Sequence, residues 1–216
     1  MADDIVFLLS PARCDGPRAQ MLMNPSASFD LAQRLRSAQG APLGEVFSFL
    51  SGLYFRGKLE YARALTASGQ RESRIKVITT NRGLRSAAEP VTREDLVAFG
   101  DVDIANGDVR YLAPLRRDAE RIRRALPSAG IVLLGSIATG KYVDTLLEVF
   151  GERLLFPAEF VGRGDMSRGG LLLRHARSGD ALTYAPVLGA VRHGKRPPKL
   201  EPVRRVRPAP GADKDV

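Results

Sequence analysis

The chain has 216 residues, of which 44% are hydrophobic and 26% are charged, and its formal net charge is +9. These fractions are ordinary for a globular protein, and no apolar run approaches the roughly 20 residues of a membrane-spanning helix. The single cysteine, Cys14, excludes an internal disulfide framework and a zinc site built from several cysteines. Two acids precede the first apolar run, which is unlike the basic start of a secretory signal. We therefore expect a cytoplasmic protein that does not enter a membrane.

Short apolar runs alternate with helical patterns along the chain. The runs predict strands at residues 5–9, 75–79, 131–134, 154–156 and 182–187. The second to fourth runs are almost continuously apolar, as expected of strands that are covered on both faces.

Between the predicted strands, five segments have the features of helices. Ser28 can cap a helix that contains Leu31 and Leu35, residues 58–65 are helical in character, and Thr92 with Asp95 resembles a capping box. The clearest helix covers residues 114–126 with Pro114 in its first position, and its charged side chains fit a solvated face better than a nucleic-acid-binding stripe. A further amphipathic helix follows Gly135 and ends near Gly151.

This alternation predicts an α/β fold: a three-layer sandwich with a mostly parallel central sheet and helices on both faces. We expect residues 1–190 to form a single domain. From residue 191 to residue 216 the chain is basic and rich in proline, and apolar periodicity is lost. Such a composition predicts a disordered tail.

The segment Gly135-Ser-Ile-Ala-Thr-Gly-Lys141 has the glycine and lysine spacing of a nucleotide-binding P-loop, and it follows a predicted strand. However, Tyr142 stands where a P-loop has the Ser or Thr that holds Mg²⁺, and no later strand ends in a second metal-anchoring Asp. The turn therefore has two interpretations. Ser136 and Lys141 bind an anion at a helix start, or Gly135 only turns the strand and Ser136 only caps the helix.

Four predicted strands run into loops that contain small, polar and cationic residues. Because the carboxyl ends of parallel strands share one edge of a sheet, we expect these loops to surround one cleft. Its predicted cations and hydrogen-bonding groups are Arg13, Asn81, Arg82, Gly135, Ser136, Lys141, Arg163, Ser167 and Arg168. This set suits a phosphate-bearing or nucleobase-bearing ligand.

Two carboxylates, Asp165 and Asp15, are candidates for general-base catalysis at such a cleft. The alternative for each is a structural role, because an Asp beside Gly often shapes a turn by accepting backbone N–H bonds. Gly162-Arg-Gly164 lacks the third glycine of a dinucleotide-binding fingerprint, which disfavours a Rossmann dehydrogenase.

Other chemistries have less support in the sequence. Cys14 beside Arg13 would need a histidine partner to act as a nucleophile, and the only histidines are His175 and the tail residue His193. Two isolated histidines also make a poor metal site. We predict no metal and no cofactor.

The segment Phe47–Lys58 is rich in aromatic residues. It predicts packing beneath the sheet, or alternatively an aromatic wall on which a base stacks, with Tyr54 and Phe55 as the rings and Arg56 and Lys58 as phosphate ligands.

The order of these segments resembles the uracil-DNA glycosylase-like superfamily, including its small bacterial branches. The corresponding segments are residues 10–15, 53–58, 80–84, 131–141 and 162–170, so that the resemblance covers residues 1–187 by order and spacing. It implies a glycosylase-like fold and, if the chain is an enzyme, a hydrolase that acts on a base or an N-glycosidic bond. The chain departs from characterised members in the loops after Ser10 and Gly162, where those proteins carry a catalytic acid or Asn and a His-Pro-Ser-like sequence.

The sequence thus leads to three functional hypotheses. The first is a nucleic-acid- or nucleotide-binding protein of glycosylase-like fold, with Asp165 or Asp15 positioning water and the cations holding phosphate. The second is a small-molecule or nucleotide-binding enzyme that uses Gly135–Lys141 as a phosphate site. The third is a non-enzymatic interaction module that contacts nucleic acid or another partner through its basic tail.

Overall fold

The computed structural model describes residues 5–201, which form an α/β fold with a mixed six-stranded central sheet. The strand order is β4-β3-β1-β6-β7-β8, and the four central strands are parallel. The strands of this sheet are β1 (Ile5–Leu9), β3 (Ile75–Ile78), β4 (Leu84–Arg85), β6 (Gly130–Leu134), β7 (Leu154–Pro157) and β8 (Tyr184–Pro186). Strands β4 and β8 pair antiparallel at the two edges. The predicted mostly parallel sheet is therefore confirmed.

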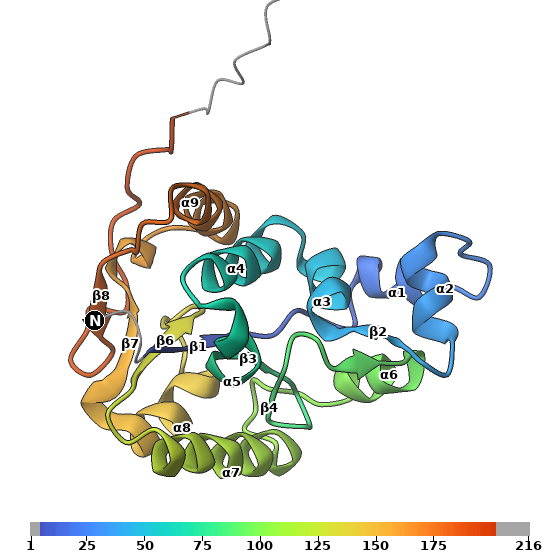
Figure 1. The fold of residues 1–216 in the computed structure, drawn as a ribbon, viewed down its shortest axis with the longest axis horizontal. Coiled ribbons are helices and arrows are strands. Elements are labelled where there is room, and N and C mark those ends of the chain that lie inside the picture. Colours follow the sequence, from blue (N-terminus) through green and yellow to red (C-terminus); the bar gives the residue numbers. More distant parts are fainter. Residues whose placement is uncertain (1–4, 202–216) are drawn as a thin grey trace, which may run out of the picture.

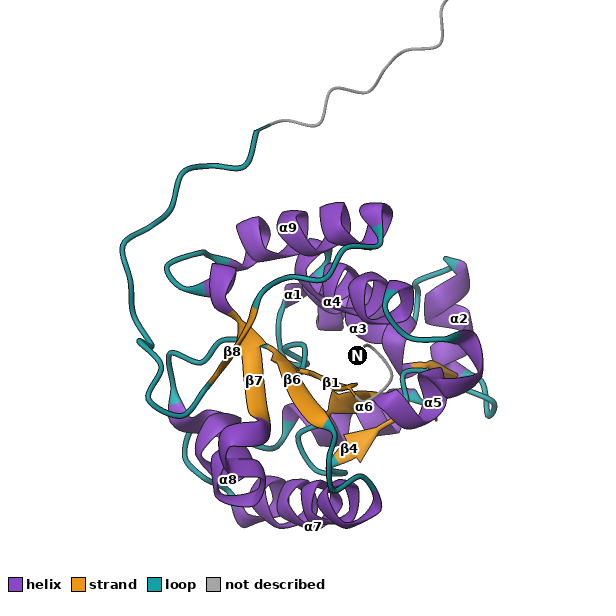
Figure 2. Cartoon of the chain, turned by 60° about the vertical axis from the view of Figure 1, so that its left-hand side comes forward, coloured by secondary structure: helices purple, strands orange, loops and turns teal. Residues whose placement is uncertain are grey.

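Helices cover both faces of this sheet, which makes the predicted three-layer sandwich (Figure 1). The helices are α1 (Pro17–Met23), α2 (Asp30–Arg36), α3 (Leu43–Ser51), α4 (Leu53–Ala64), α5 (Arg71–Arg74), α6 (Arg93–Gly100), α7 (Val109–Ala125), α8 (Gly140–Phe150) and α9 (Asp165–Ser178). Three short 3₁₀ turns are η1 (Ser68–Gln70), η2 (Gly151–Arg153) and η3 (Ala158–Phe160). Helices α4 and α9 lie on one face, and α7 and α8 lie on the other (Figure 2). A small ladder of β2 (Ala41–Pro42) and β5 (Pro90–Val91) lies beside α3.

The central strand β1 contributes to both hydrophobic cores. Phe7 and Leu9 pack in the core on the α4 and α9 side, whereas Val6 and Leu8 pack in the core on the α7 and α8 side. This alternation follows from the two-residue period of a strand. It also explains why the run is continuously apolar, since both faces of β1 are buried.

Helices α4 and α9 approach each other very closely. A Cβ atom on Gly57 would lie 2.7 Å from the carbonyl oxygen of Gly169, and one on Gly169 would lie 2.8 Å from the carbonyl oxygen of Leu53. The two glycines therefore allow a backbone contact that no larger residue permits. This contact brings the start of α9 next to the α4 side chains that point toward the sheet.

Local signals predicted several helix ends correctly. The capping box is present, because the Thr92 hydroxyl accepts from the Asp95 N–H and the Asp95 carboxylate accepts from the Thr92 N–H. Helix α8 ends at Phe150, and its C-cap is the predicted Gly151, whose φ of 57° favours glycine.

Two predicted helix starts were wrong. Ser28 does not cap α2, which begins after Phe29. Helix α7 starts at Val109, so that Pro114 lies inside it and not at its first position. The Asp108 side chain accepts from the Arg110 N–H and starts α7 earlier, and the fully buried Tyr111 anchors the added turn.

Part of the predicted tail lies on the domain. Residues 191–201 contain no helix or strand, yet Leu200 packs against the core and the Pro198 carbonyl accepts a hydrogen bond from Arg163 at 3.3 Å. The rest of the predicted disordered tail, residues 202–216, lies outside the described residues.

Candidate functional site

The carboxyl ends of the four parallel strands meet at one edge of the sheet. Strand β3 comes after β1 in the chain and pairs with one edge of β1. Strand β6 comes later and pairs with the other edge, so the direction of strand order in the sheet reverses between β1 and β6. In open α/β sheets, ligands bind outside the carboxyl ends of the strands at such a reversal. The two residues that follow these strands are Ser10 and Gly135.

A pocket of about 610 Å³ opens at this edge, beside the β1 end. This volume is in the range of small-molecule and nucleotide sites. Its walls are the loop after β1, the segment after α6, Thr80 and Lys141. The lining residues are Pro11, Ala12, Arg13, Cys14, Asp15, Thr80, Phe99, Gly100, Asp101, Val102, Asp103, Ile104, Ala105 and Lys141. Three predicted site residues, Arg13, Asp15 and Lys141, therefore share one pocket.

Arg13 and Asp15 form an ion pair in the wall of this pocket. The Arg13 Nε donates to the Asp15 carboxylate at 2.6 Å, and both side chains are more than half exposed. Hydrogen bonding from Arg13 lowers the pKa of Asp15, so this carboxylate stays ionised. It can accept a hydrogen bond from water or ligand, while the guanidinium keeps donors for an anion.

Lys141 is the other cation of the pocket. It lies in the first turn of α8 with an exposed side chain, and it makes no ion pair within the described part of the chain. Across the pocket, the Asp103 carboxylate is used in its own turn, where it accepts from the Ala105 N–H and the Asn106 amide. Lys141 is therefore available to a ligand.

In the loop after β3, the predicted cation Arg82 does not line this pocket. Arg82 ion pairs with Asp95 on α6 and stacks over Phe99 at 5.8 Å from the ring centroid. Asn81 donates to the Ala98 carbonyl oxygen at 3.0 Å. Both residues fasten the end of β3 to α6, and Thr80 is the residue of this loop that lines the pocket.

The basic loop before α9 is also held by internal contacts. Arg163 donates to the Glu159 carbonyl and to the Ser167 hydroxyl, at 3.0 and 3.2 Å. Arg168 donates to the Phe160 carbonyl at 3.1 Å and lies 3.5 Å from the Asp165 carboxylate. None of the four predicted site residues of this loop and helix lines the pocket that contains Lys141; they are Arg163, Asp165, Ser167 and Arg168. The structure thus separates the predicted cations into two groups.

Two amide groups of the turn from Gly135 to Lys141 are used in hydrogen bonds within the turn and to Tyr142. The Ser136 N–H donates to the Tyr142 hydroxyl at 3.1 Å, and that hydroxyl donates back to the Ser136 carbonyl at 3.0 Å. The Ala138 N–H donates to the Ser136 hydroxyl at 3.3 Å. Ser136 therefore does not cap α8, whose N-cap is Thr139. The Tyr142 hydroxyl thus takes one amide group, that of Ser136, which a P-loop would offer to phosphate.

The aromatic segment packs inside the protein. Phe55 is fully buried and meets Phe47 edge to face with ring centroids 5.3 Å apart. A fully buried ring offers no face to a ligand, so the predicted role of Phe55 in base stacking is wrong. Tyr54 is 6% exposed, and its hydroxyl has no hydrogen-bond partner among the described residues.

Lys58 is buried beside these rings and does not reach solvent. Its ammonium lies 4.5 Å from the Tyr54 ring centroid and 4.8 Å from that of Phe55, and it donates to the Ser10 carbonyl and hydroxyl oxygens. The predicted use of Lys58 as a phosphate ligand on an exposed aromatic wall is therefore wrong. Because it lies four residues after Tyr54 on the apolar stripe of α4, its burial could have been predicted from helical spacing.

Cys14 has the properties of a structural thiol. It is 5% exposed, and burial together with the nearby Asp15 charge raises its pKa to about 12. Its thiol donates to the Ala12 carbonyl. His175, a candidate partner, lies near the C-terminal end of α9, where its Nδ1 is hydrogen-bonded to the Asp180 carbonyl. The structure thus disfavours a Cys–His nucleophile.

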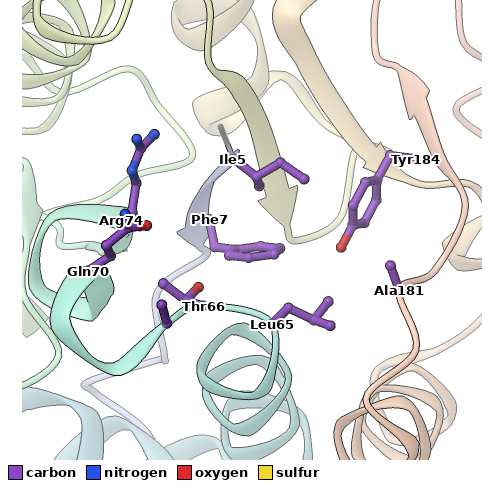
Figure 3. Close-up of a pocket in the computed structure, with 9 residues that line it drawn as sticks. Ile5, Phe7, Leu65, Thr66, Gln70, Arg74, Ala181 and Tyr184 are labelled. Atoms are coloured by element: carbon purple, nitrogen blue, oxygen red, sulfur yellow. The ribbon is translucent and has the colours of Figure 1, made fainter. Parts of the chain in front are cut away.

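A second cavity lies next to the first residue of β1, between the end of α4 and the segment before β8 (Figure 3). The rings of Phe7 and Tyr184 line this cavity, and its volume is about 60 Å³. This is enough for a few water-sized groups and too small for a nucleotide. The pocket beside Lys141 is therefore the better candidate for a ligand.

Sequence reasoning missed Ser10, Asp101 and Asp103. Ser10 directly follows the buried strand β1 and begins the polar loop after it. The two aspartates enter the pocket from the segment after α6, which no strand-end pattern indicates.

Comparison of the chain with protein-family models, with curated proteins and with solved structures found no match in any of the three. Within residues 5–201, no helix combines the length and the apolar character needed to cross a membrane. The functional assignment therefore depends on the geometry of the carboxyl edge.

Proposed function

We propose that the protein binds a nucleotide or a nucleotide unit of a nucleic acid in the pocket at the carboxyl edge of its sheet. One observation carries this proposal: two cations, Lys141 and Arg13, line the same pocket of about 610 Å³, and Lys141 makes no ion pair among the described residues. The phosphate lies between these cations. Asp101 accepts hydrogen bonds from the sugar or base, as carboxylates do from ribose hydroxyls in other α/β sheets.

A reaction on a base or an N-glycosidic bond is the catalytic form of this proposal. It needs a carboxylate that positions water close to the ligand. Asp15 is the better candidate of the two predicted aspartates, because it lines the pocket and its pKa is lowered by Arg13. Asp165 is exposed at the start of α9 and does not line this pocket.

Binding measurements with a charge-removing variant test the proposal. Nucleoside mono- and triphosphates are titrated by calorimetry, and single- and double-stranded DNA and RNA by fluorescence anisotropy, at low and moderate salt. We expect affinity for at least one of these ligands, and a loss of roughly tenfold or more in Lys141→Ala, since a charged hydrogen bond contributes about 1.5–3 kcal/mol. For nucleic acid, affinity also falls steeply with salt.

Lys76→Ala is the matched control, because Lys76 also carries one exposed positive charge but lies on β3, where it donates to the Glu72 carbonyl. Equal affinities of the two variants would remove Lys141 from the site. Absence of binding to every nucleotide and nucleic acid at low salt would overturn the proposed function itself.

A further inference from the structure

Ser10 and Lys58 form a buried polar pair at the point where the strand order reverses. The Lys58 Nζ lies 2.8 Å from the Ser10 hydroxyl oxygen and 2.6 Å from the Ser10 carbonyl oxygen. Ser10 directly follows β1, and Lys58 comes from the middle of α4. A distance of 2.8 Å is within the range that joins a nucleophile to its base in enzymes.

The surroundings of Lys58 favour an unprotonated amine. Lys58 is 1% exposed, and within the described residues no carboxylate approaches within ion-pair distance of it. The charged groups that act on it, Asp165 and Arg168, both come from α9 and oppose each other. Burial dominates and lowers the pKa of Lys58 to about 7, which makes the neutral amine accessible near neutral pH.

In the neutral form, the amine can reverse one of its two hydrogen bonds. The carbonyl oxygen of Ser10 can only accept, so Lys58 continues to donate to it. The hydroxyl of Ser10 can donate, and the lone pair of the neutral amine then accepts its proton. With one N–H on the carbonyl, the neutral amine keeps a second N–H and a lone pair, and the lone pair can face the Ser10 Oγ.

The pair borders the pocket at the carboxyl edge. Pro11 and Ala12, the two residues after Ser10, line that pocket, and Ser10 itself is 6% exposed. On its other side, Ser10 contacts the β6 end. A Cβ atom on Gly135 would lie 2.9 Å from both the Ser10 Cβ and the Tyr142 hydroxyl. Gly135 therefore lets a serine and a tyrosine hydroxyl meet at the strand reversal, where ligands of such sheets bind.

We propose that Ser10 and Lys58 act as a nucleophile and its general base in an acyl-transfer site that hydrolyses small esters or amides. The Ser10 Oγ attacks the carbonyl carbon of the substrate, and the hydroxyl proton passes to the Lys58 amine. The tetrahedral adduct collapses, and the leaving alcohol or amine takes that proton from the Lys58 ammonium. Water then attacks the acyl-serine, Lys58 accepts its proton, and the acid is released as the proton returns to Ser10.

The small exposed area of Ser10 limits the substrate to a slender acyl group that enters from the Pro11 and Ala12 side. Arg168 acts electrostatically on Lys58, and the Tyr142 hydroxyl lies beside Ser10 at Gly135. The substrate passes Pro11 and Ala12, which also line the Lys141 pocket, but the reacting groups Ser10 and Lys58 are different from the cations that hold phosphate. Failure of the nucleotide-binding experiment would therefore leave the labelling of Ser10 unaffected, and absence of labelling would leave nucleotide binding unaffected.

Covalent labelling of the full chain tests the proposal. A small alkyl fluorophosphonate forms a serine–phosphorus bond and releases fluoride, and intact mass with peptide mapping locates the adduct. We expect one adduct on Ser10, with a labelling rate that rises between pH 6 and 8, has its midpoint near 7 and then levels off. Lys58→Met slows labelling by at least about 100-fold, as removal of a general base does.

Two variants serve as controls. Ser178→Ala removes a hydroxyl from the C-terminal end of α9, and Lys76→Met removes a lysine from β3; both retain wild-type labelling. Ser10→Ala abolishes the adduct. If Lys58→Met fails to fold, two results test the proposal without it: the labelling rate of the wild type must rise between pH 6 and 8, and Ser10→Ala must lose the adduct. No adduct on Ser10 between pH 6 and 9, or an equal rate in folded Lys58→Met, overturns the proposal.

Discussion

Gly57 and Gly169 bring two helices into backbone contact across the face of the sheet. A Cβ on Gly57 would lie 2.7 Å from the Gly169 carbonyl oxygen, which is closer than real Cβ contacts allow. The contact determines the position of Lys58, the next residue of α4, relative to Arg168, the residue before Gly169. The buried polar pair at the β1 end therefore depends on how closely α4 and α9 pack.

Alanine at either of these glycines is expected to destabilise the protein. Gly57→Ala and Gly169→Ala each push the helices apart, and overpacking of this kind typically costs about 1–3 kcal/mol of unfolding free energy. Urea denaturation followed by circular dichroism measures the change. Gly69→Ala is the control, since nothing lies within 4 Å of a Cβ at that position and its φ suits any residue. A loss no greater than in the control would mean that the helices move apart freely.

The Tyr142 hydroxyl is expected to stabilise the turn after β6. Tyr142→Phe leaves the half-buried Ser136 N–H without its acceptor, for which we expect a loss of about 1 kcal/mol, the lower end of the cost of an unsatisfied donor. Tyr111→Phe is a matched control, because the Tyr111 hydroxyl is buried and has no partner among the described residues. Its removal should leave stability unchanged or raise it slightly. Thermal and urea unfolding measure the stability of the two variants. Equal losses in both would contradict the stabilising role of the Tyr142 hydroxyl.

Lys58 is expected to make stability depend on pH. Its folded pKa is lowered from 10.5 to about 7, so above pH 7 the unfolded chain binds a proton that the folded protein has lost. Stability contributed by this group therefore rises with pH from about 7 to 8.5, by at most about 1.4 kcal/mol per pH unit. Above that window the raised pKa of Cys14 acts in the opposite direction.

Urea unfolding at several pH values between 6.5 and 8.5 measures this slope, which should disappear in Lys58→Met. Lys76→Met is the control and should keep the wild-type slope. A slope that survives unchanged in Lys58→Met would show that another group titrates.

Asp118 is expected to connect α7 to the edge strand β4. It is 8% exposed, and its carboxylate accepts from the Leu84 N–H at 3.1 Å and from Arg117 at 2.9 Å. Asp118→Ala leaves the buried Leu84 N–H unpaired, for which we expect a loss of about 1–3 kcal/mol. Glu120, on the same helix, is half-buried and makes a long ion pair of 3.9 Å with Arg124, so Glu120→Ala should change stability by less than about 0.5 kcal/mol. Hydrogen exchange of the Leu84 amide gives an independent measurement, and unchanged protection in Asp118→Ala would refute the connection.

Much of the fold was predictable because its signals are local. The strands at residues 5–9 and 131–134 are apolar on both faces, and the three-layer arrangement follows from their alternation with amphipathic helices. The capping box at Thr92 lies within one turn and needs no distant partner. The helix starts at Ser28 and Pro114 were wrong: α2 begins after Phe29 without a side-chain cap, and Asp108 caps α7 before Pro114 is reached.

The candidate site was predictable only in part. Parallel strands place Arg13, Asp15 and Lys141 on one edge, and the pocket brings them together. The remaining arginines have the same sequence features, yet Arg82 pairs with Asp95 and Arg168 bonds to the Phe160 carbonyl. Which cation stays available to a ligand depends on partners that are 13 or 8 residues away. No strand-end pattern contains this information.

By itself, the sequence determined which segments are buried and that their strand ends share an edge, since hydrophobic periodicity and chain order are enough for both. Tertiary structure alone decided the chemistry at that edge. The Tyr142 hydroxyl occupies the turn that resembled a phosphate cradle, and Lys58 turns inward to Ser10, 48 residues earlier in the chain. The physical reason is that hydrogen-bond partners and desolvation are properties of the packed interior, where a lysine changes from a surface cation to a buried amine.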